Sequence, residues 1–83
     1  MNYPKLASCS PDDIERTLRK LGGFVFKKSG SKHLKITHNN TGKAWMIPRR
    51  VPIKKGLMWD FVRSYLQKEL RLSEEEIFKH LWC

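Results

Sequence analysis

Apolar and polar residues alternate with two different periods along this chain, and each change of period marks an element. Residues 11–21 carry apolar side chains at a spacing of four and three, which gives an α-helix one apolar face. These side chains are Ile14, Leu18 and Leu21. Ser10 and Pro11 predict the helix start, because the serine can cap free amides and proline fits the first helical position. Gly22 and Gly23 predict its end.

Three short stretches with strand character follow this helix. They are residues 24–28, 32–38 and 44–47. The first is aromatic and β-branched, the second alternates polar and apolar side chains, and the third is short and apolar. Ser29-Gly30 joins the first two, and residues 39–42, Asn-Asn-Thr-Gly, join the others. Such short links predict an antiparallel meander, which Pro48 and Pro52 close because proline cannot donate to a central ladder.

Two further helices are predicted after the strands. The longer one covers about residues 57–70 and carries a broad apolar face. This face consists of Leu57, Met58, Phe61, Val62, Tyr65 and Leu66. Residues 73–76, Ser-Glu-Glu-Glu, are typical of a capping box that begins a short final helix. The order helix, three strands, helix, short helix predicts a single α+β domain, residues 1–83, folded as a two-layer sandwich with one open sheet face.

The distribution of charge indicates what the open face binds. The chain has 17 Lys and Arg against 8 Asp and Glu, a formal net charge of +9. No acidic residue occurs between Gly22 and Trp59, where basic residues are frequent. These are Lys27, Lys28, Lys32, Lys35, Lys43, Arg49, Arg50, Lys54 and Lys55. A basic sheet with basic loops favours nucleic acid over a membrane, which normally recruits a basic amphipathic helix, and RNA over duplex DNA, because no basic recognition helix is present. Solubility alone is the alternative interpretation.

The cysteine content and the lengths of the apolar runs argue against several other classes of protein. Cys9 and Cys83 are too few for a disulfide framework or a zinc site, and we expect both to be reduced and structurally incidental. The first ten residues lack the apolar centre of a signal peptide, and no apolar run is long enough for a membrane span. The sequence therefore predicts a cytoplasmic protein without membrane, metal or cofactor.

His33 is the main candidate for chemistry. It lies with Lys35 on the polar face of the second predicted strand, because side chains alternate along a strand. Leu34 and Ile36 point the other way. An imidazole beside phosphate-binding cations suits general acid–base chemistry on RNA, with the cations stabilising charge on a phosphorane. The alternative is that His33 only donates a hydrogen bond to a phosphate or to a backbone carbonyl.

The other two histidines are interpreted as structural. His38 ends the second strand and by alternation shares the side of the apolar residues. His80 lies near the end of the final helix, where it can interact with the helix dipole.

Five short motifs, taken in order, resemble the HicA family of bacterial toxins, which are small messenger-RNA interferases with a double-stranded-RNA-binding-domain-like fold. The motifs are Leu21-Gly22-Gly23-Phe24, Gly30-Ser31-Lys32-His33-Leu34, Met46-Ile47-Pro48-Arg49, Lys54-Lys55-Gly56 and Leu72-Ser73-Glu74-Glu75-Glu76. The resemblance extends over about residues 10–81. It implies metal-independent RNA cleavage, growth arrest, and neutralisation by a HicB antitoxin that covers the active face.

The resemblance also assigns roles to individual residues. The family's catalytic histidine lies in a Gly-Ser-x-His pattern, which carries over to His33. We expect RNA to be bound by Lys28, Ser31, Lys32, Lys35, Arg49, Arg50, Lys54 and Lys55. Many family members have a histidine where this chain has Arg50, and this departure removes a second acid–base candidate.

The leading hypothesis is therefore a small endoribonuclease, the toxin of a bacterial type II toxin–antitoxin pair involved in stress response, with oligomers formed mainly through a HicB-like antitoxin. The alternative is a non-catalytic double-stranded-RNA-binding module. A third hypothesis is a protein-interaction domain anchored by Trp45, Trp59 and Trp82, although core packing is commoner for tryptophan in a small domain.

Overall fold

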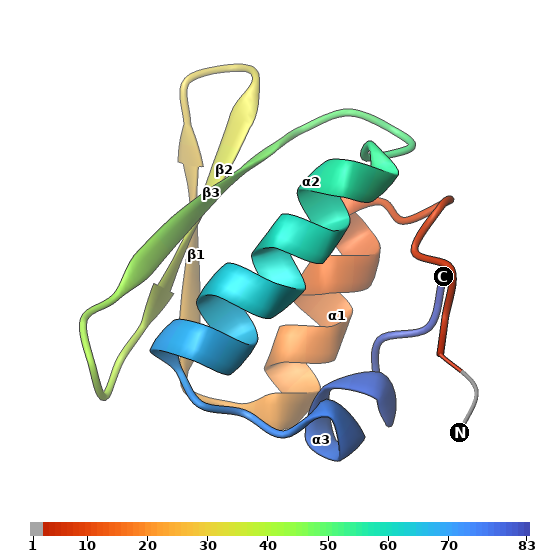
Figure 1. Ribbon diagram of the computed structural model, residues 1–83. Coiled ribbons are helices and arrows are strands. Elements are labelled where there is room, and N and C mark those ends of the chain that lie inside the picture. The colour runs from red at the N-terminus through yellow and green to blue at the C-terminus, as the bar shows by residue number, and fades with distance from the viewer. Residues whose placement is uncertain (1–2) are drawn as a thin grey trace.

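The chain folds into a three-stranded antiparallel sheet with helices along one of its faces (Figure 1). A computed structural model describes residues 3–83. The elements are α1 (Pro11–Leu21), β1 (Phe24–Ser29), β2 (His33–His38), β3 (Ala44–Pro48), α2 (Lys55–Asp60), η1 (Phe61–Glu69) and α3 (Glu74–Phe78). The predicted α+β class and the predicted order of elements are confirmed.

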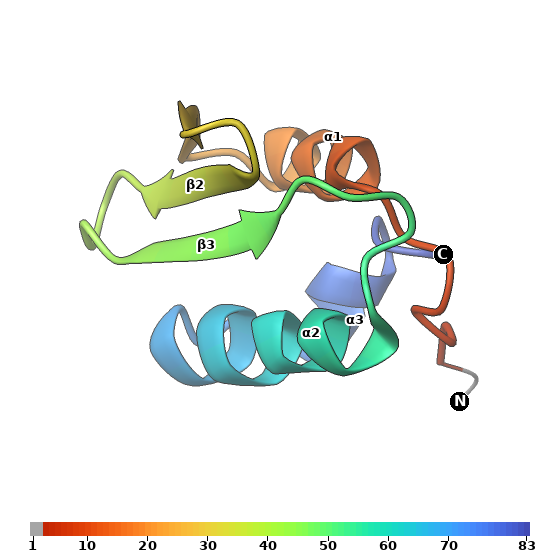
Figure 2. The same ribbon diagram turned by 90° about the horizontal axis from the view of Figure 1, so that it is seen from above.

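The sheet has β2 at its centre, with β1 and β3 as its two edges. The register places Phe26 opposite Ile36, and Ile36 opposite Trp45. This row faces the helices, as does the pair formed by Leu34 and Ile47, and the two isoleucines and Leu34 are buried in the core. α1 packs against β1 and η1 packs against β3, so both long helices cover the same sheet face (Figure 2).

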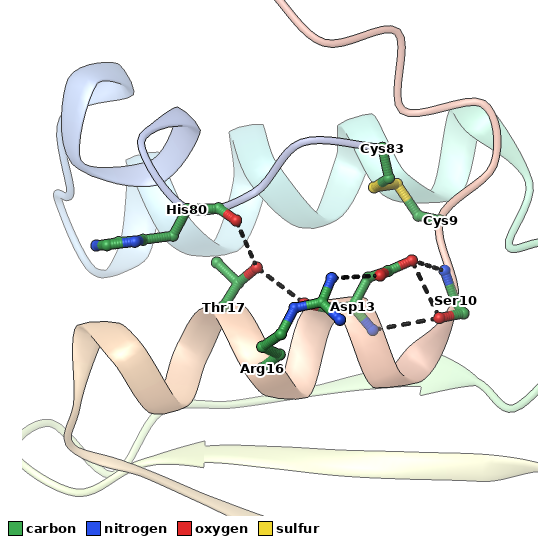
Figure 3. Close-up of a disulfide and its surroundings, with 7 residues drawn as sticks. All are labelled: Cys9, Ser10, Asp13, Arg16, Thr17, His80 and Cys83. Carbon is green, nitrogen blue, oxygen red and sulfur yellow. Dashed lines mark hydrogen bonds and ion pairs between the residues drawn. A yellow bond between two sulfur atoms is a disulfide. The ribbon is translucent and has the colours of Figure 1, made fainter.

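The start of α1 is fixed by a reciprocal pair of hydrogen bonds, shown in Figure 3. The Ser10 hydroxyl accepts from the Asp13 amide at 3.2 Å, and the Asp13 carboxylate accepts from the Ser10 amide at 2.9 Å. This is a capping box. Partial burial would raise the pKa of Asp13, but hydrogen bonds from Ser10 and Arg16 hold that pKa below its usual range.

The capping box predicted for the last helix forms only in half. The Ser73 hydroxyl accepts from the Glu76 amide at 3.1 Å, which caps α3 as expected. The Glu76 carboxylate accepts from the Ser73 hydroxyl rather than from the Ser73 amide, so the reciprocal bond is absent from this pair.

The second long helix departs from regular α-helical geometry. α2 continues directly into η1, which is π-helical, so a turn of η1 takes more than four residues. Its buried residues occur as two adjacent pairs, residues 61–62 and residues 65–66. The predicted apolar face is confirmed except at Leu57, which is 43 % exposed because the next residue, Met58, takes the buried position. Across residues 3–83, none of the helices is both long and apolar enough to cross a membrane.

The two ends of the described chain lie together and complete the core. Cys9 and Cys83 form a disulfide, with their Cα atoms 5.1 Å apart (Figure 3). The prediction of two reduced, incidental cysteines is therefore wrong. The two residues are 74 positions apart, and only the tertiary fold brings the start of α1 against the segment after α3.

The Tyr65 side chain links η1 to the loop between β2 and β3. Its hydroxyl donates a hydrogen bond to the Lys43 carbonyl oxygen at 2.8 Å, and its ring stacks on Trp45 with 5.7 Å between centroids. The residue has no exposed surface. Burial raises the pKa of Tyr65 to about 12, and the nearby carboxylate of Glu69 adds to this rise.

We expect Tyr65 to make the free energy of unfolding depend on pH above about pH 10. The unfolded tyrosine loses its proton near pH 10, whereas the folded residue keeps it to about pH 12, so the folded state loses stability as the pH rises through this window. Tyr65→Phe should cost about 1 kcal/mol at pH 7 through the lost hydrogen bond, and almost nothing at about pH 11. Urea unfolding of both proteins at the two pH values measures this difference, and a constant difference would contradict the proposed burial.

Candidate functional site

His33, the first residue of β2, stands on the open face of the sheet. Its neighbours across the strands are Ser29 on β1 and Pro48 on β3. Alternation places the next residue, Leu34, in the core and leaves His33 exposed, as the sequence predicted. His33 is exposed, and within residues 3–83 no hydrogen bond holds its imidazole, so the ring is available to a ligand.

A hollow of about 440 Å³ lies beside this histidine. Its walls are formed by Lys32, His33, Pro48, Arg49 and Arg50. The backbone amide of Arg49 donates to the carbonyl oxygen of Lys32 at 2.7 Å, which fixes the end of β3 against the turn before β2. Every wall residue except Pro48 presents a nitrogen donor, and none is acidic, so the hollow suits an anion.

The turn between β1 and β2 forms one side of this hollow. Gly30 takes a φ of +69°, a conformation that residues with a Cβ rarely adopt. Ser31 follows, and its carbonyl oxygen accepts a long hydrogen bond of 3.4 Å from the Arg49 guanidinium. Ser31 therefore acts on the site through its backbone, by orienting an arginine.

The remaining predicted RNA-binding residues lie outside the hollow. Lys35 stands on the same open face, two residues further along β2. Lys28 is exposed near the end of β1, although the pleat directs it to the other side of the sheet. Lys54 and Lys55 lie at the start of α2, beyond the loop that leaves β3, and line no part of the hollow.

Two residues of the open face were not among the predicted RNA-binding residues. Lys27 lies directly opposite Lys35 in the register, and Met46 lies on the other side of Lys35 with 46 % of its surface exposed. The signal for Lys27 was present in the alternation of β1, where Phe24 and Phe26 turn toward the helices. The open face thus combines a row of two lysines and a methionine with the cationic hollow at one end.

Two arginines of α1 differ from the basic residues of the sheet because acids neutralise them. Both ion pairs found among residues 3–83 lie on α1, where Arg16 meets Asp13 at 2.6 Å and Arg19 meets Glu15 at 2.7 Å. Arg19 also lies over the ring of Phe26, 5.0 Å from its centroid. The cations of the hollow have no such carboxylate partner, so their charge is available to a ligand.

The His38 side chain takes part in packing, in agreement with its structural interpretation, whereas the contact found for His80 is made by its backbone. The Nδ1 atom of His38 lies 3.0 Å from the Thr41 hydroxyl, and its ring lies 5.0 Å from that of Phe24. The backbone carbonyl of His80 lies 3.3 Å from the hydroxyl of Thr17, a buried side chain of α1 (Figure 3).

The three tryptophans do not form a set of exposed anchors. The ring of Trp45 is stacked against that of Tyr65 under the sheet. The rings of Trp59 and Phe78 pack edge to face, with 5.9 Å between their centroids. Trp82 is 60 % exposed. The interaction-domain hypothesis therefore retains one of its three proposed anchors.

No metal centre is evident in the part of the chain that the structure describes. Within it, no group of three or more His, Cys, Asp and Glu side chains is arranged to hold a metal ion. The chain matches no protein-family model, no curated protein and no solved structure. Its class thus rests on the fold and the hollow, which define a small α+β domain with a cationic site on an open antiparallel sheet.

We expect the hollow, rather than net charge, to govern binding of a single-stranded polynucleotide. Arg49→Gln/Arg50→Gln removes two unpaired cations, which should lower the slope of log affinity against log salt by about 1.4. Arg16→Gln/Arg19→Gln removes the same charge from paired positions and should leave the slope nearly unchanged. Fluorescence anisotropy over a salt series measures both slopes. An equal decrease of the slope in the two variants would show that only overall charge matters.

Proposed function

We propose that this protein is a metal-independent endoribonuclease, the toxin of a bacterial toxin–antitoxin pair of the HicA type. The observation that carries the proposal is an exposed histidine in a hollow lined by Lys32, Arg49 and Arg50, without any acid in its walls. The element order of the chain supports the double-stranded-RNA-binding-domain-like fold that the resemblance implies. The Gly-Ser-x-His pattern supports the assignment of His33 as the catalytic residue.

In this mechanism the cations bind and His33 moves the proton. Lys32, Arg49 and Arg50 hold an RNA phosphate in the hollow, next to the free imidazole. His33 takes the proton of the adjacent 2′-hydroxyl, whose oxygen attacks the phosphorus. The guanidinium groups stabilise the negative charge of the phosphorane, and the leaving 5′-oxygen takes a proton from the imidazolium or from water. The first products are then a 2′,3′-cyclic phosphate and a free 5′-hydroxyl.

The alternative function, a double-stranded-RNA-binding module without catalysis, is favoured by one specific feature. Among residues 3–83 the imidazole of His33 has no hydrogen-bonding partner to orient it, and the position of the second histidine found in many HicA proteins is taken by Arg50. Such a module would retain duplex RNA tightly, with no turnover and no toxicity on induction. The proposed enzyme instead consumes its substrate.

The proposed partner is a HicB-like antitoxin that covers the open face in the cytoplasm. An acidic partner gains complementary charge from Lys27, Lys35 and the hollow, and it screens His33 from RNA. Oligomers would form mainly through this partner. Addition of the neighbouring gene's product should therefore stop cleavage, and a stable complex that still cleaves RNA would contradict the masking.

Replacement of the proposed catalyst tests the function directly. Purified protein should degrade RNA in the presence of EDTA, and His33→Ala should lower the single-turnover rate by about 10²–10⁴-fold, the range typical of general acid–base catalysis. The substitution should leave the fold unchanged because His33 is exposed. His80→Gln is the matched control, since it changes a histidine outside the hollow and should cleave at the wild-type rate. If His33→Ala cleaves as fast as the wild type, His33 is not the catalyst.

A further inference from the structure

Three segments that are distant in the sequence meet at the disulfide. Cys9 immediately precedes the cap of α1, and Cys83 follows α3 (Figure 3). The amide of Leu6 donates to the carbonyl oxygen of Cys83 at 2.7 Å. The amide of Ile53 donates to the carbonyl oxygen of Cys9, also at 2.7 Å. Ile53 belongs to residues 49–54, the loop that connects β3 to α2, so residues 6–9, Cys83 and this loop meet at the disulfide.

This loop carries the two arginines of the hollow and is held at two points. At its start, the Arg49 amide is bound by Lys32, and near its end the Ile53 amide is bound by Cys9. The Ile53 side chain is also buried in the core, with 1 % of its surface exposed. Arg50 and Val51 lie exposed between these anchors, and Val51 is 78 % exposed. The backbone of Cys9 therefore fixes the end of the loop that follows the two arginines.

The cap of α1 already holds that backbone on its C-terminal side, and the disulfide couples it in addition to the last residue of the described chain. Cys9 has no exposed surface, and Cys83 is partly exposed. Without the covalent link, residues 79–83 keep the backbone bond from Leu6, the bond from the Thr17 hydroxyl to the His80 carbonyl and the buried side chain of Leu81. Segments held by so few contacts open locally at low free-energy cost, whereas β2, paired on both sides, does not.

We propose that the Cys9–Cys83 disulfide is a redox-controlled clamp on the arginine loop, residues 49–54. In the oxidised protein the clamp holds Arg49 and Arg50 at the hollow, and reduction releases the loop while the sheet stays folded. Oxidation thus completes the site, and in the reducing cytoplasm that the proposed function implies, the site stays loose until the disulfide forms.

The reductant is a dithiol, and the exchange balances in two steps. A thiolate of the dithiol attacks the sulfur of the partly exposed Cys83, the S–S bond breaks, and the electron pair leaves with the Cys9 sulfur, which takes a proton. The second thiol of the reductant then attacks the mixed disulfide and releases Cys83 as a thiol. The dithiol becomes a disulfide, and the protein gains two electrons and two protons.

Backbone dynamics test the clamp without any reference to RNA. ¹⁵N relaxation of the oxidised wild type should give order parameters near about 0.85 at Val51 and Ile53, and reduction with a dithiol should lower them below about 0.6. The amides of Leu34 and Ile36 should stay near 0.85 in both states. Cys9→Ser/Cys83→Ser should reproduce the reduced protein without reductant. Order parameters at Val51 and Ile53 that do not change on reduction would overturn the proposal. Loss of the β2 signals through global unfolding would overturn it as well.

A second arm of the experiment concerns the ligand, and this arm alone rests on the proposed function. The reduced protein should bind single-stranded RNA about three- to tenfold more weakly than the oxidised protein, because two cations are no longer fixed. Equal affinity of the two forms would overturn the link between the clamp and the site. If neither form binds RNA, the proposed function fails, whereas the relaxation data still decide whether the clamp exists.

Discussion

The pleat of β2 fixes both the core and the candidate site of this protein. Leu34 and Ile36 point into the core beneath the helices, so His33 and Lys35 must point to solvent. A shift of the strand by one residue would bury the histidine and expose the leucine, which makes the register costly to change. The exposure of His33 is therefore as secure as the burial of Leu34.

Electrostatics then give this exposed position its chemical character. The acids of the chain lie in its helical part, and those of α1 neutralise Arg16 and Arg19. The hollow has no acid in its walls, so its cations repel one another at close range, and a bound phosphate relieves that repulsion. The hydrogen bond from the Arg49 amide to Lys32 keeps these charges together. The sheet supplies the geometry of the hollow, and the charge distribution favours an anionic ligand.

Local sequence signals predicted the parts of this structure that depend on neighbours in the chain. The Ser10 cap, the turn at Gly30 and the alternation through His33 each rest on a few adjacent residues, and the structure confirms them. Arg49 was predicted only as an RNA-binding residue, and the register of the meander places it beside His33. What the sequence did not predict depends on contacts between distant segments or on small geometric differences.

The Cys9–Cys83 disulfide is the clearest example of a feature that local patterns cannot reveal. Two cysteines 74 residues apart give no local pattern, and their pairing requires the packing of both chain ends. The π-helical geometry of η1 is similar, because four-residue spacing of apolar side chains is compatible with an α-helix as well. The half-formed box at Ser73 shows that a motif can supply a cap without its reciprocal bond. Pro48 lines the hollow only because the strand register places it beside His33.

The central claim is that RNA is bound and cut at the hollow beside His33. The most direct measurement is a crystal structure of the oxidised protein with a short RNA whose 2′-hydroxyls are methylated to prevent cleavage. A phosphate should lie between Arg49 and Arg50, with an imidazole nitrogen of His33 about 3 Å from the neighbouring 2′-oxygen. RNA bound along α1, or a phosphate in the hollow with His33 turned away from every 2′-oxygen, would contradict the claim.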